Sequence, residues 1–406
     1  MTVPKLRFKE FDGGWTKSTI QFFMDNNFIL DQMDGNHGEL YPKSEEFSAT
    51  GVPYISATDF SFGDVNFATC KRLPIERAKL FKKGIAKNGD VLFAHNATVG
   101  PVAILKTDLD FVILSTTATY YRCEATYLNN HYLKNYFESD FFVQQYFGIM
   151  SQSTRNQVPI TTQRKLNIAV PNIQEQTKIA SFLSAVDEKI SQLTQKHELL
   201  SQYKQGMMQK LFSQQLRFKA DDGSEFREWE EKELKDIAEI NPKSKKLPES
   251  FIYIDLESVE KGQLLLQKNI ELQDAPSRAQ RLLAKGDVLF QMVRPYQQNN
   301  YYFNLSGEYV ASTGYAQIRT KLDSKFIYYA LHEKTFLDEV MNRCTGTSYP
   351  AINSSDLSSI EILIPCLEEQ TKIANFLSAI DQKIEVVAQQ IEQAKTWKKG
   401  LLQQMF

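Results

Sequence analysis

Two stretches of the chain, residues 179–211 and 373–405, repeat apolar residues in alternating steps of four and three positions. Eight of the ten positions defined in this way are apolar in the first stretch and nine of ten in the second, and a lysine stands at the same step in both. Two apolar positions in every seven residues are typical of a coiled-coil seam rather than of a surface helix. The pattern predicts two long helices, the first from about residue 173 to 212, whose seam includes Ile179, Leu183, Val186, Ile190, Leu193, Ile373, Leu377, Ile380, Ile384 and Val387.

These helices belong to a repeat that covers most of the chain. Residues 174–190 and 368–384, at an offset of 194, are identical at 13 of 17 positions, and the match resumes between 204–212 and 398–406. Upstream the two copies share little beyond short landmarks such as the sequence GDVLF. A repeat with this period indicates two copies of one architecture, each with a near-identical helical end and a divergent body.

The bodies mix short strand-like runs with helical ones, which predicts an α+β fold. We therefore expect two pseudo-twofold-related globular bodies joined by two long coiled-coil helices, which twofold symmetry makes antiparallel. The same symmetry predicts that the two ends of the chain lie close together. The alternative is that each helix packs separately on its own body. The expected regions are a first body (1–158), a first helical region (159–215), a second body (216–348) and a second helical region (349–406).

Composition narrows the function classes. The 406 residues include 47 Lys and Arg against 49 Asp and Glu, a net charge of -2, which argues against a strongly basic protein that wraps nucleic acid. Local concentrations of basic residues remain compatible with this total. The four cysteines are scattered without a C-x-x-C pair, and no apolar run approaches ~18 residues. We expect a soluble protein of a reducing compartment, the cytoplasm.

One stretch of the first body is strongly basic. Between residues 71 and 87 seven Lys and Arg stand against a single acid. Such a stretch forms either an ordinary solvated face or an edge that contacts nucleic-acid phosphates. On the second interpretation the candidate contacts are Lys71, Arg72, Lys82 and Lys83.

Polar loops follow each GDVLF strand and precede each helical region. Asn and Gln can bond adenine through two hydrogen bonds, and Arg can bond guanine in the same way, so these loops are candidates for reading bases. A plain surface loop would have a similar composition. The candidates after the strands are His95, Asn96, Thr98, Gln291, Arg294, Tyr296, Gln297 and Asn299, and those before the helical regions are Thr154, Arg155, Asn156, Thr347, Ser348 and Tyr349. Two bodies with unlike loops would read two different short sequences at a fixed spacing.

Motifs for catalysis are missing from the sequence. No G-x-x-x-x-G-K-[ST] phosphate loop occurs, and no Asn/Asp-Pro-Pro-aromatic loop of an amino-methyltransferase. The five histidines have no metal-ligand spacing. Acid-x-Lys patterns such as Asp187-Glu188-Lys189 and Glu230-Glu231-Lys232 occur in nucleases but are also common on charged helices. We therefore expect no catalytic residue, no metal and no cofactor in this chain.

The repeated segments also resemble a known family, the DNA-specificity subunits of type I restriction-modification enzymes. The resemblance covers nearly the whole chain and rests on the helix beginnings at Pro171–Leu183 and Pro365–Leu377, their shared ends, the GDVLF strands and Arg294-Pro295-Tyr296. It implies a subunit without catalytic activity, whose two target-recognition domains each read one half of a bipartite, asymmetric site in double-stranded DNA. The helices would set the spacing and dock two modification (methyltransferase) subunits, and the full complex would add restriction subunits.

By the same resemblance, S-adenosylmethionine, ATP and Mg would bind only to the partner subunits. The chain departs from an even repeat in two places. His95-Asn96-Ala97-Thr98 stands where the second body has the Arg294 loop, and Cys366 stands where the first copy has Asn172. Two alternatives remain, a helical scaffold or adaptor that does not bind DNA, and a stand-alone methyltransferase or nuclease.

Overall fold

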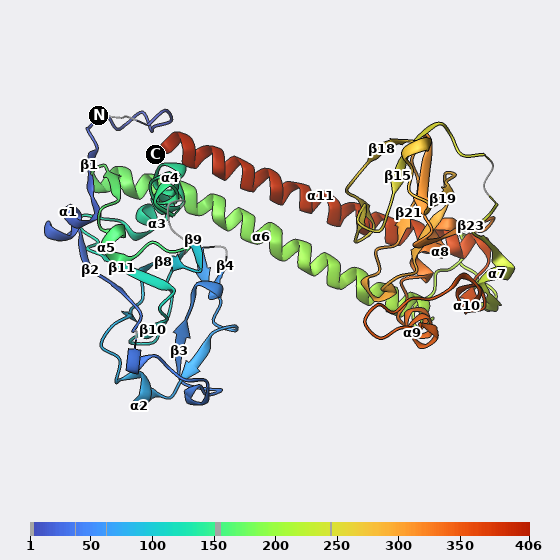
Figure 1. Ribbon diagram of the computed structural model, residues 1–406, viewed down its shortest axis with the longest axis horizontal. Helices are drawn as coiled ribbons and strands as arrows, with labels where there is room; N and C mark the ends of the chain where they lie inside the picture. Colours follow the sequence, from blue (N-terminus) through green and yellow to red (C-terminus); the bar gives the residue numbers. More distant parts are fainter. Residues whose placement is uncertain (1–3, 37, 62, 151–155, 244–245) are drawn as a thin grey trace. The chain divides into compact units, whose positions relative to one another are not determined.

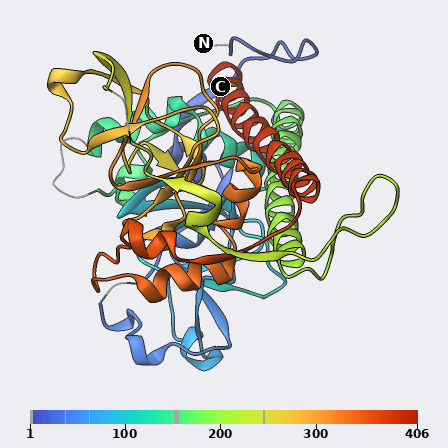
Figure 2. The same ribbon diagram turned by 90° about the vertical axis from the view of Figure 1, so that its right-hand side faces the viewer.

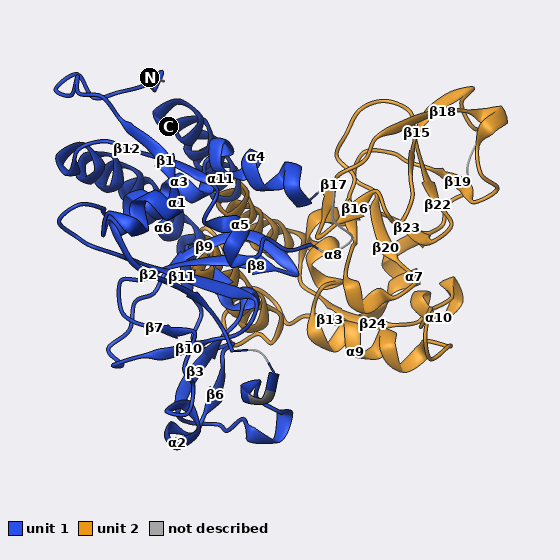
Figure 3. Cartoon of the chain, turned by 60° about the vertical axis from the view of Figure 1, so that its left-hand side comes forward, with its two compact units in different colours: residues 1–196, 387–406 blue, residues 197–386 orange. Residues whose placement is uncertain are grey.

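The computed structural model describes residues 4–36, 38–61, 63–150, 156–243 and 246–406. The chain forms two compact units (Figure 3). Unit 1 comprises residues 1–196 and 387–406, and unit 2 comprises residues 197–386. Each unit therefore contains one body and parts of both long helices. The four regions expected from the sequence separate the bodies from the helical regions, whereas each unit combines a body with parts of both helices. The bounds of the four regions therefore stay a prediction.

The two long helices are α6 (Ile173–Phe212) and α11 (Leu367–Met405), so the predicted first helix is confirmed. Within unit 1 the beginning of α6 packs on the end of α11, and within unit 2 the end of α6 packs on the beginning of α11 (Figure 1). The helices are therefore paired and antiparallel in each unit, and the alternative of separate packing is wrong. The seam residues named above are buried, except for Ile384, which is half-buried.

In each unit one lysine forms an ion pair between the two long helices. In unit 1, Lys398 of α11 forms an ion pair with Asp187 of α6 at 2.7 Å. In unit 2 the roles of the helices are exchanged, and Lys204 of α6 pairs with Asp381 of α11 at 2.6 Å. The two lysines are the polar residues found at the same step of both seams. A charged pair at such a position costs stability relative to an apolar pair but favours one register over others.

The body of unit 1 contains two four-stranded sheets and several short helices. Helices α3 (Asn130–Glu138) and α4 (Asp140–Met150) pack on the first sheet, where the rings of Phe137 and Phe142 each lie 6.0 Å from the ring of Phe93. The first sheet has the order β2 (Ile29–Asp34), β11 (Ala118–Cys123), β8 (Val91–Asn96), β9 (Thr98–Ile104). The second has the order β6 (Lys71–Leu73), β3 (Val52–Ile55), β10 (Val112–Leu114), β7 (Ile85–Ala86). The remaining elements are β1 (Thr16–Thr19), which pairs with β12 (Asn167–Val170), the pair β4 (Phe60–Ser61) and β5 (Asp64–Val65), and α1 (Ile20–Asp25), α2 (Ile75–Ala78), α3 (Asn130–Glu138), α4 (Asp140–Met150) and α5 (Ile160–Gln163).

Unit 2 repeats this plan, with its GDVLF strand β20 (Val288–Gln291) in the place of β8. The second sheet of each unit contains one parallel pair, β3 with β10 in unit 1 and β15 (Ser250–Ile254) with β22 (Tyr309–Ser312) in unit 2. The sheets have the orders β14 (Ala238–Ile240), β23 (Tyr315–Thr320), β20 (Val288–Gln291), β21 (Tyr301–Tyr302) and β18 (Lys268–Glu271), β15 (Ser250–Ile254), β22 (Tyr309–Ser312), β19 (Ala279–Leu282). The other elements are the pair β13 (Glu230–Glu233) and β24 (Glu361–Ile364), the pair β16 (Val259–Glu260) and β17 (Gln263–Leu264), and α7 (Leu234–Ile237), α8 (Ser324–Ala330), α9 (Lys334–Arg343) and α10 (Ser354–Ser358). The α+β fold expected from the sequence is confirmed.

The most similar part of the repeat holds the beginning of each long helix. The carboxylate of Glu175 is fully buried and accepts hydrogen bonds from Arg7 at 2.7 and 2.8 Å and from Trp15 at 3.3 Å. The copy in unit 2 is the same, since Glu369 accepts from Arg217 at 2.9 and 3.2 Å and from Trp229 at 3.1 Å. A buried carboxylate needs hydrogen-bond partners of this kind, so the repeated glutamate occurs with the same Arg and Trp partners in both units.

The described ends of the chain lie together in unit 1, as the symmetry predicts. The backbone N–H of Leu6 donates to the carbonyl of Gln404 at 2.8 Å, and Phe406 packs on Tyr132 with 5.4 Å between ring centroids. In unit 2 the corresponding bond joins Leu216 to Lys210 at 3.1 Å within a continuous chain. Figure 2 shows that this part of the chain leaves α6 as an irregular segment before β13. No helix in the described part of the chain is long and apolar enough to span a membrane.

Candidate DNA interface

Two loops that are distant in sequence meet in each unit. In unit 1 the loop after β8 is bonded to the segment before α5 through the backbone. The N–H of Ala97 donates to the carbonyl of Asn156 at 3.0 Å, and the N–H of Val158 donates to the carbonyl of His95 at 2.8 Å. Asn96 also forms an antiparallel bridge with Gln157. The loop after a GDVLF strand and the loop before a helical region therefore form a single surface element.

The same junction occurs in unit 2 with different residues. The N–H of Arg294 donates to the carbonyl of Pro350 at 2.7 Å, and the N–H of Ile352 donates to the carbonyl of Met292 at 3.1 Å. Val293 forms the bridge, here with Ala351. The two bodies thus share a backbone scaffold at this place although their loops differ in sequence.

The residue at the centre of each junction has an unusual backbone conformation. Ala97 has a φ of 63° and Arg294 a φ of 54°, both in the left-handed region. This backbone conformation costs a residue other than glycine roughly 1–2 kcal/mol of conformational energy. Residues in it are common where the surrounding structure fixes a functional geometry. The shared strain indicates that the junction is maintained in both units.

The loop of unit 2 is held from inside by Gln291. Its side chain is buried, donates to the carbonyl of Val293 at 2.8 Å and to Gln297 at 2.9 Å, and accepts the N–H of Asn299 at 3.0 Å. The sequence suggested Gln291 as a base-reading residue. The structure places it in the interior of the loop, where it positions its neighbours, because all of its amide groups are used within the loop.

The other candidates of unit 2 lie at or near the surface. Arg294 is half-buried, and its guanidinium carbon lies 4.3 Å from the ring centroid of Tyr349. Asn299 is half-buried and accepts the N–H of Lys261 at 3.0 Å. The exposed candidates are Tyr296, Gln297, Thr347, Ser348 and Tyr349. The structure therefore brings both predicted loops of the second body to one place.

In unit 1 the candidates are less uniform. His95 is buried, and its Nδ1 lies 2.9 Å from the hydroxyl of Thr119, so this side chain belongs to the interior rather than to the surface of the loop. Thr98 and Asn156 are exposed, and Asn96 is half-buried. The candidates Thr154 and Arg155 lie outside the described residues.

The basic stretch of unit 1 lies on another sheet. Lys71, Lys82 and Lys83 are exposed, whereas Arg72 is half-buried and donates to the carbonyl of Gly51 at 3.2 Å. Lys71 begins β6, the first strand of the sheet β6-β3-β10-β7. The exposed lysines suit a contact with phosphates, and Arg72 has a role within the fold.

The ion pairs of the long helices explain one of the nuclease-like patterns. Asp187 accepts from Lys134 at 2.9 Å and from Lys398 at 2.7 Å, and Lys398 also pairs with Glu138 at 2.7 Å. Burial disfavours the charged form of Lys134, but Glu138 and Asp187 outweigh it and raise its pKa to about 12. Burial also opposes the charge of Asp187, yet the two lysines lower its pKa. Asp187 therefore holds the helix pair together. The sequence signal for this cluster was Lys398, which occupies the same step of its seam as Lys204 does in the other seam.

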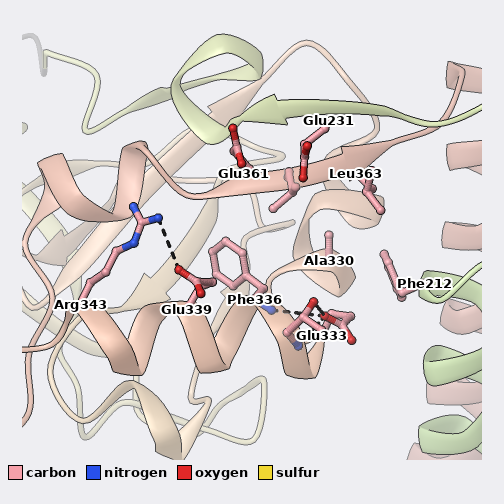
Figure 4. A pocket seen from close by; sticks show the side chains of 11 residues that line it. Phe212, Glu231, Ala330, Glu333, Phe336, Glu339, Arg343, Glu361 and Leu363 are labelled. Atoms are coloured by element: carbon pink, nitrogen blue, oxygen red, sulfur yellow. Dashed lines mark hydrogen bonds and ion pairs between the residues drawn. The ribbon is translucent and has the colours of Figure 1, made fainter.

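The second nuclease-like pattern borders a small acidic pocket of unit 2 (Figure 4). The cavity has a volume of about 350 Å³, and Glu231 of β13 and Glu361 of β24 both line it. Glu339 lies on the opposite side and pairs with Arg343 at 3.5 Å. An acidic lining repels phosphates, so this pocket is no part of the candidate interface. Among the described residues no group of three His, Cys, Asp or Glu side chains is placed to hold a metal ion.

Comparisons with known proteins agree on one family. The family model of the type I restriction modification DNA specificity domain matches the chain twice, over residues 31–202 and 227–396. A putative type I restriction enzyme MjaX specificity subunit from Methanocaldococcus jannaschii is 28% identical over 333 residues, which cover 77% of this chain and 76% of that protein. The MjaVIII specificity subunit of the same organism is 27% identical over 256 residues, 58% of this chain and 60% of that protein.

Two solved structures are similar over nearly the full length. The S subunit of a type I restriction-modification system from M. genitalium covers 100% of this chain and 99% of its own, at 16% identity and a TM-score of 0.58. A chain from a study of complex assembly and conformational transition of the type I R-M system covers 97% and 98%, at 19% identity and a TM-score of 0.57. At these identities the likeness shows a shared fold.

Proposed function

The chain belongs to the family of type I restriction-modification DNA specificity domains, and from this premise we propose that it is the DNA-reading subunit of such a complex. Each body reads one half of a bipartite, asymmetric site in double-stranded DNA, in the cytoplasm. The paired helices α6 and α11 set the spacing between the half-sites and dock two modification subunits. Restriction subunits join the same complex.

The junction of the two loops carries this proposal. Ala97 and Arg294 occupy equivalent places, with the same left-handed backbone and the same hydrogen bond to the second loop. The side chains on this shared scaffold differ between the units. A constant scaffold with variable side chains suits two readers of different sequences, because phosphate contacts fix the position on DNA and base contacts supply the specificity.

We assign the candidate residues to two kinds of contact. Arg294, Gln297, Thr98 and Asn156 have the donors and acceptors that read base edges in the major groove. The exposed lysines of the basic stretch contact phosphates, which adds affinity without sequence preference. The near-neutral total charge fits a subunit whose partners supply much of the affinity for DNA.

Catalysis belongs to the partners in this proposal. Methyl transfer to adenine with S-adenosylmethionine is the work of the modification subunits, and ATP-driven cleavage with Mg is the work of the restriction subunits. In this chain the aspartate of the nuclease-like pattern on α6 is engaged by two lysines. The chain contributes recognition and spacing.

The test is co-expression with a type I modification subunit from the same genome, followed by sequencing of methylated bases across the host genome. We expect one bipartite motif with methylated adenine in each half, and its loss when this chain is omitted. An equal methylation pattern without the chain would contradict the proposal, and so would the absence of any bipartite motif. The modification subunit expressed alone is the control.

A further inference from the structure

Arg294 and Tyr349 come from the two different loops of unit 2 and form one stacked pair. The guanidinium carbon lies 4.3 Å from the ring centroid, a distance typical of a cation–π contact. The loops are fixed to each other beneath the pair by the Arg294 N–H to Pro350 bond at 2.7 Å. The bridge between Val293 and Ala351 lies beside it. The position of the arginine therefore depends on both loops.

The arginine side chain is constrained in a way that suits recognition. Its Nε is buried and has no hydrogen-bond partner, so the outward donors are the two terminal amino groups. Within the described part of the chain, Arg294 makes no ion pair. Tyr349 is 64% exposed, which places the stacked pair at the surface. A strained backbone thus presents a guanidinium that rests on the ring of Tyr349 and makes no ion pair with the described residues.

This chemistry matches one base. The two terminal amino groups of an arginine bond the O6 and N7 of guanine in the major groove, and stacking on a ring fixes the plane in which they do so. A phosphate would accept the same donors but does not require a fixed plane. We propose that Arg294 reads a guanine in the half-site of unit 2 and that Tyr349 is a positioning residue, which holds the guanidinium in the plane of that base. This inference rests on the proposed function.

The described part of unit 1 contains no such pair. Ala97 occupies the equivalent place with the same backbone bond and has no donor to offer. We therefore expect the two half-sites to be read differently at the corresponding base pair, where the Arg294–Tyr349 pair requires guanine in the half-site of unit 2.

The experiment compares four variants of the full chain, each assembled with the modification subunit. The variants are Arg294→Ala, Tyr349→Ala, Tyr349→Phe and the double alanine variant. The readouts are the methylated motif in cells and competition binding of the purified complex to duplexes with each base at the guanine position. Leu265→Ala, at a side chain of unit 2 that is 54% exposed and lies outside both loops, is the matched control.

We expect Arg294→Ala to lower the preference for guanine by about 10- to 100-fold at one base pair. Tyr349→Ala should relax the same base pair and no other, whereas Tyr349→Phe should keep the preference because the ring remains. The double variant should be no more relaxed than Arg294→Ala, since the tyrosine acts through the arginine. Leu265→Ala should leave the motif unchanged.

Three results would overturn the inference. The first is a Tyr349→Ala variant that methylates all sites more weakly with an unchanged motif, which is the result of a phosphate contact or a structural role. The second is relaxation at a different base pair from that of Arg294→Ala. The third is a double variant with the sum of two independent losses. A wild-type complex without any bipartite motif would instead contradict the proposed function, and this inference with it.

Discussion

Replacing Glu175 by glutamine should destabilise unit 1 strongly although the change removes no bulk. The carboxylate has no exposed surface, and it accepts two hydrogen bonds from Arg7 and one from Trp15. Only 12% of the Arg7 side chain is exposed, so the variant leaves a mostly buried arginine without its counter-ion, with the carbonyl of Gly13 at 2.6 Å as a remaining acceptor. Breaking a buried ion pair by removing one partner costs about 3–5 kcal/mol.

The expected loss lies at the lower end of that range. The glutamine keeps one carbonyl oxygen as an acceptor, and Arg7 keeps a small contact with water, so we expect about 3 kcal/mol. For a unit of about 200 residues, 1 kcal/mol lowers the melting temperature by roughly 2–4 °C. Glu175→Gln should therefore lower it by roughly 6–12 °C. Thermal unfolding followed by circular dichroism, with urea unfolding as a second measure, tests this value.

Two control variants make the result specific. Glu369→Gln removes the same charge from the copy in unit 2, where Arg217 and Trp229 take the places of Arg7 and Trp15, so its effect should be similar. Glu225→Gln removes a charge from an exposed pair with Lys219 and should have no measurable effect. The reasoning is refuted if Glu175→Gln is as harmless as Glu225→Gln, or if only one of the two buried copies matters.

Three further predictions concern pH, chain connectivity and spacing. Burial lowers the pKa of His332 to about 4, so the unfolded chain binds the proton at a higher pH than the folded one. The stability of unit 2 should fall as the pH decreases from about 6.5 to about 4, and urea unfolding across this range should show a shallower fall for His332→Asn. Joining Phe406 to Lys5 by a short linker and opening the chain at the exposed Gly223 should give a folded protein, since the ends already meet, and a permuted chain without cooperative unfolding would contradict this. Deleting one heptad from each long helix should change the spacing of the methylated motif and leave the bases of both halves unchanged, and altered half-site bases would speak against the helices as spacers.

The helices were predictable because their pattern is local and occurs twice. The seven-residue period predicted α6 and the burial of Ile179 and its companions, and the repeat predicted that the helices are antiparallel. The order of strands in the bodies was out of reach. Parallel pairs such as β3 with β10 join segments far apart in the chain, and no local pattern encodes which strands meet.

The candidate site was predictable as a set of loops but not as a geometry. The sequence showed polar loops at equivalent places, and the structure joins them in both units. The left-handed backbone at Ala97 and Arg294 had no signal, because neither residue is a glycine or an asparagine. Gln291 turned inward because its side-chain amide satisfies backbone groups of the loop, the carbonyl of Val293 and the N–H of Asn299. His95 turned inward toward the side-chain hydroxyl of Thr119. The stack of Arg294 on Tyr349 required two loops to be placed together first.

The independence of the two readers is the central claim, and exchanging one body tests it most directly. Residues 229–352, which include both loops of unit 2, are replaced by the corresponding segment of a relative with a different target, the chain is co-expressed with its modification subunit, and the methylated motif is sequenced. We predict that one half of the motif changes to that of the donor while the other half stays as it was. A change in both halves, or in neither, in a chain that still assembles would contradict the account.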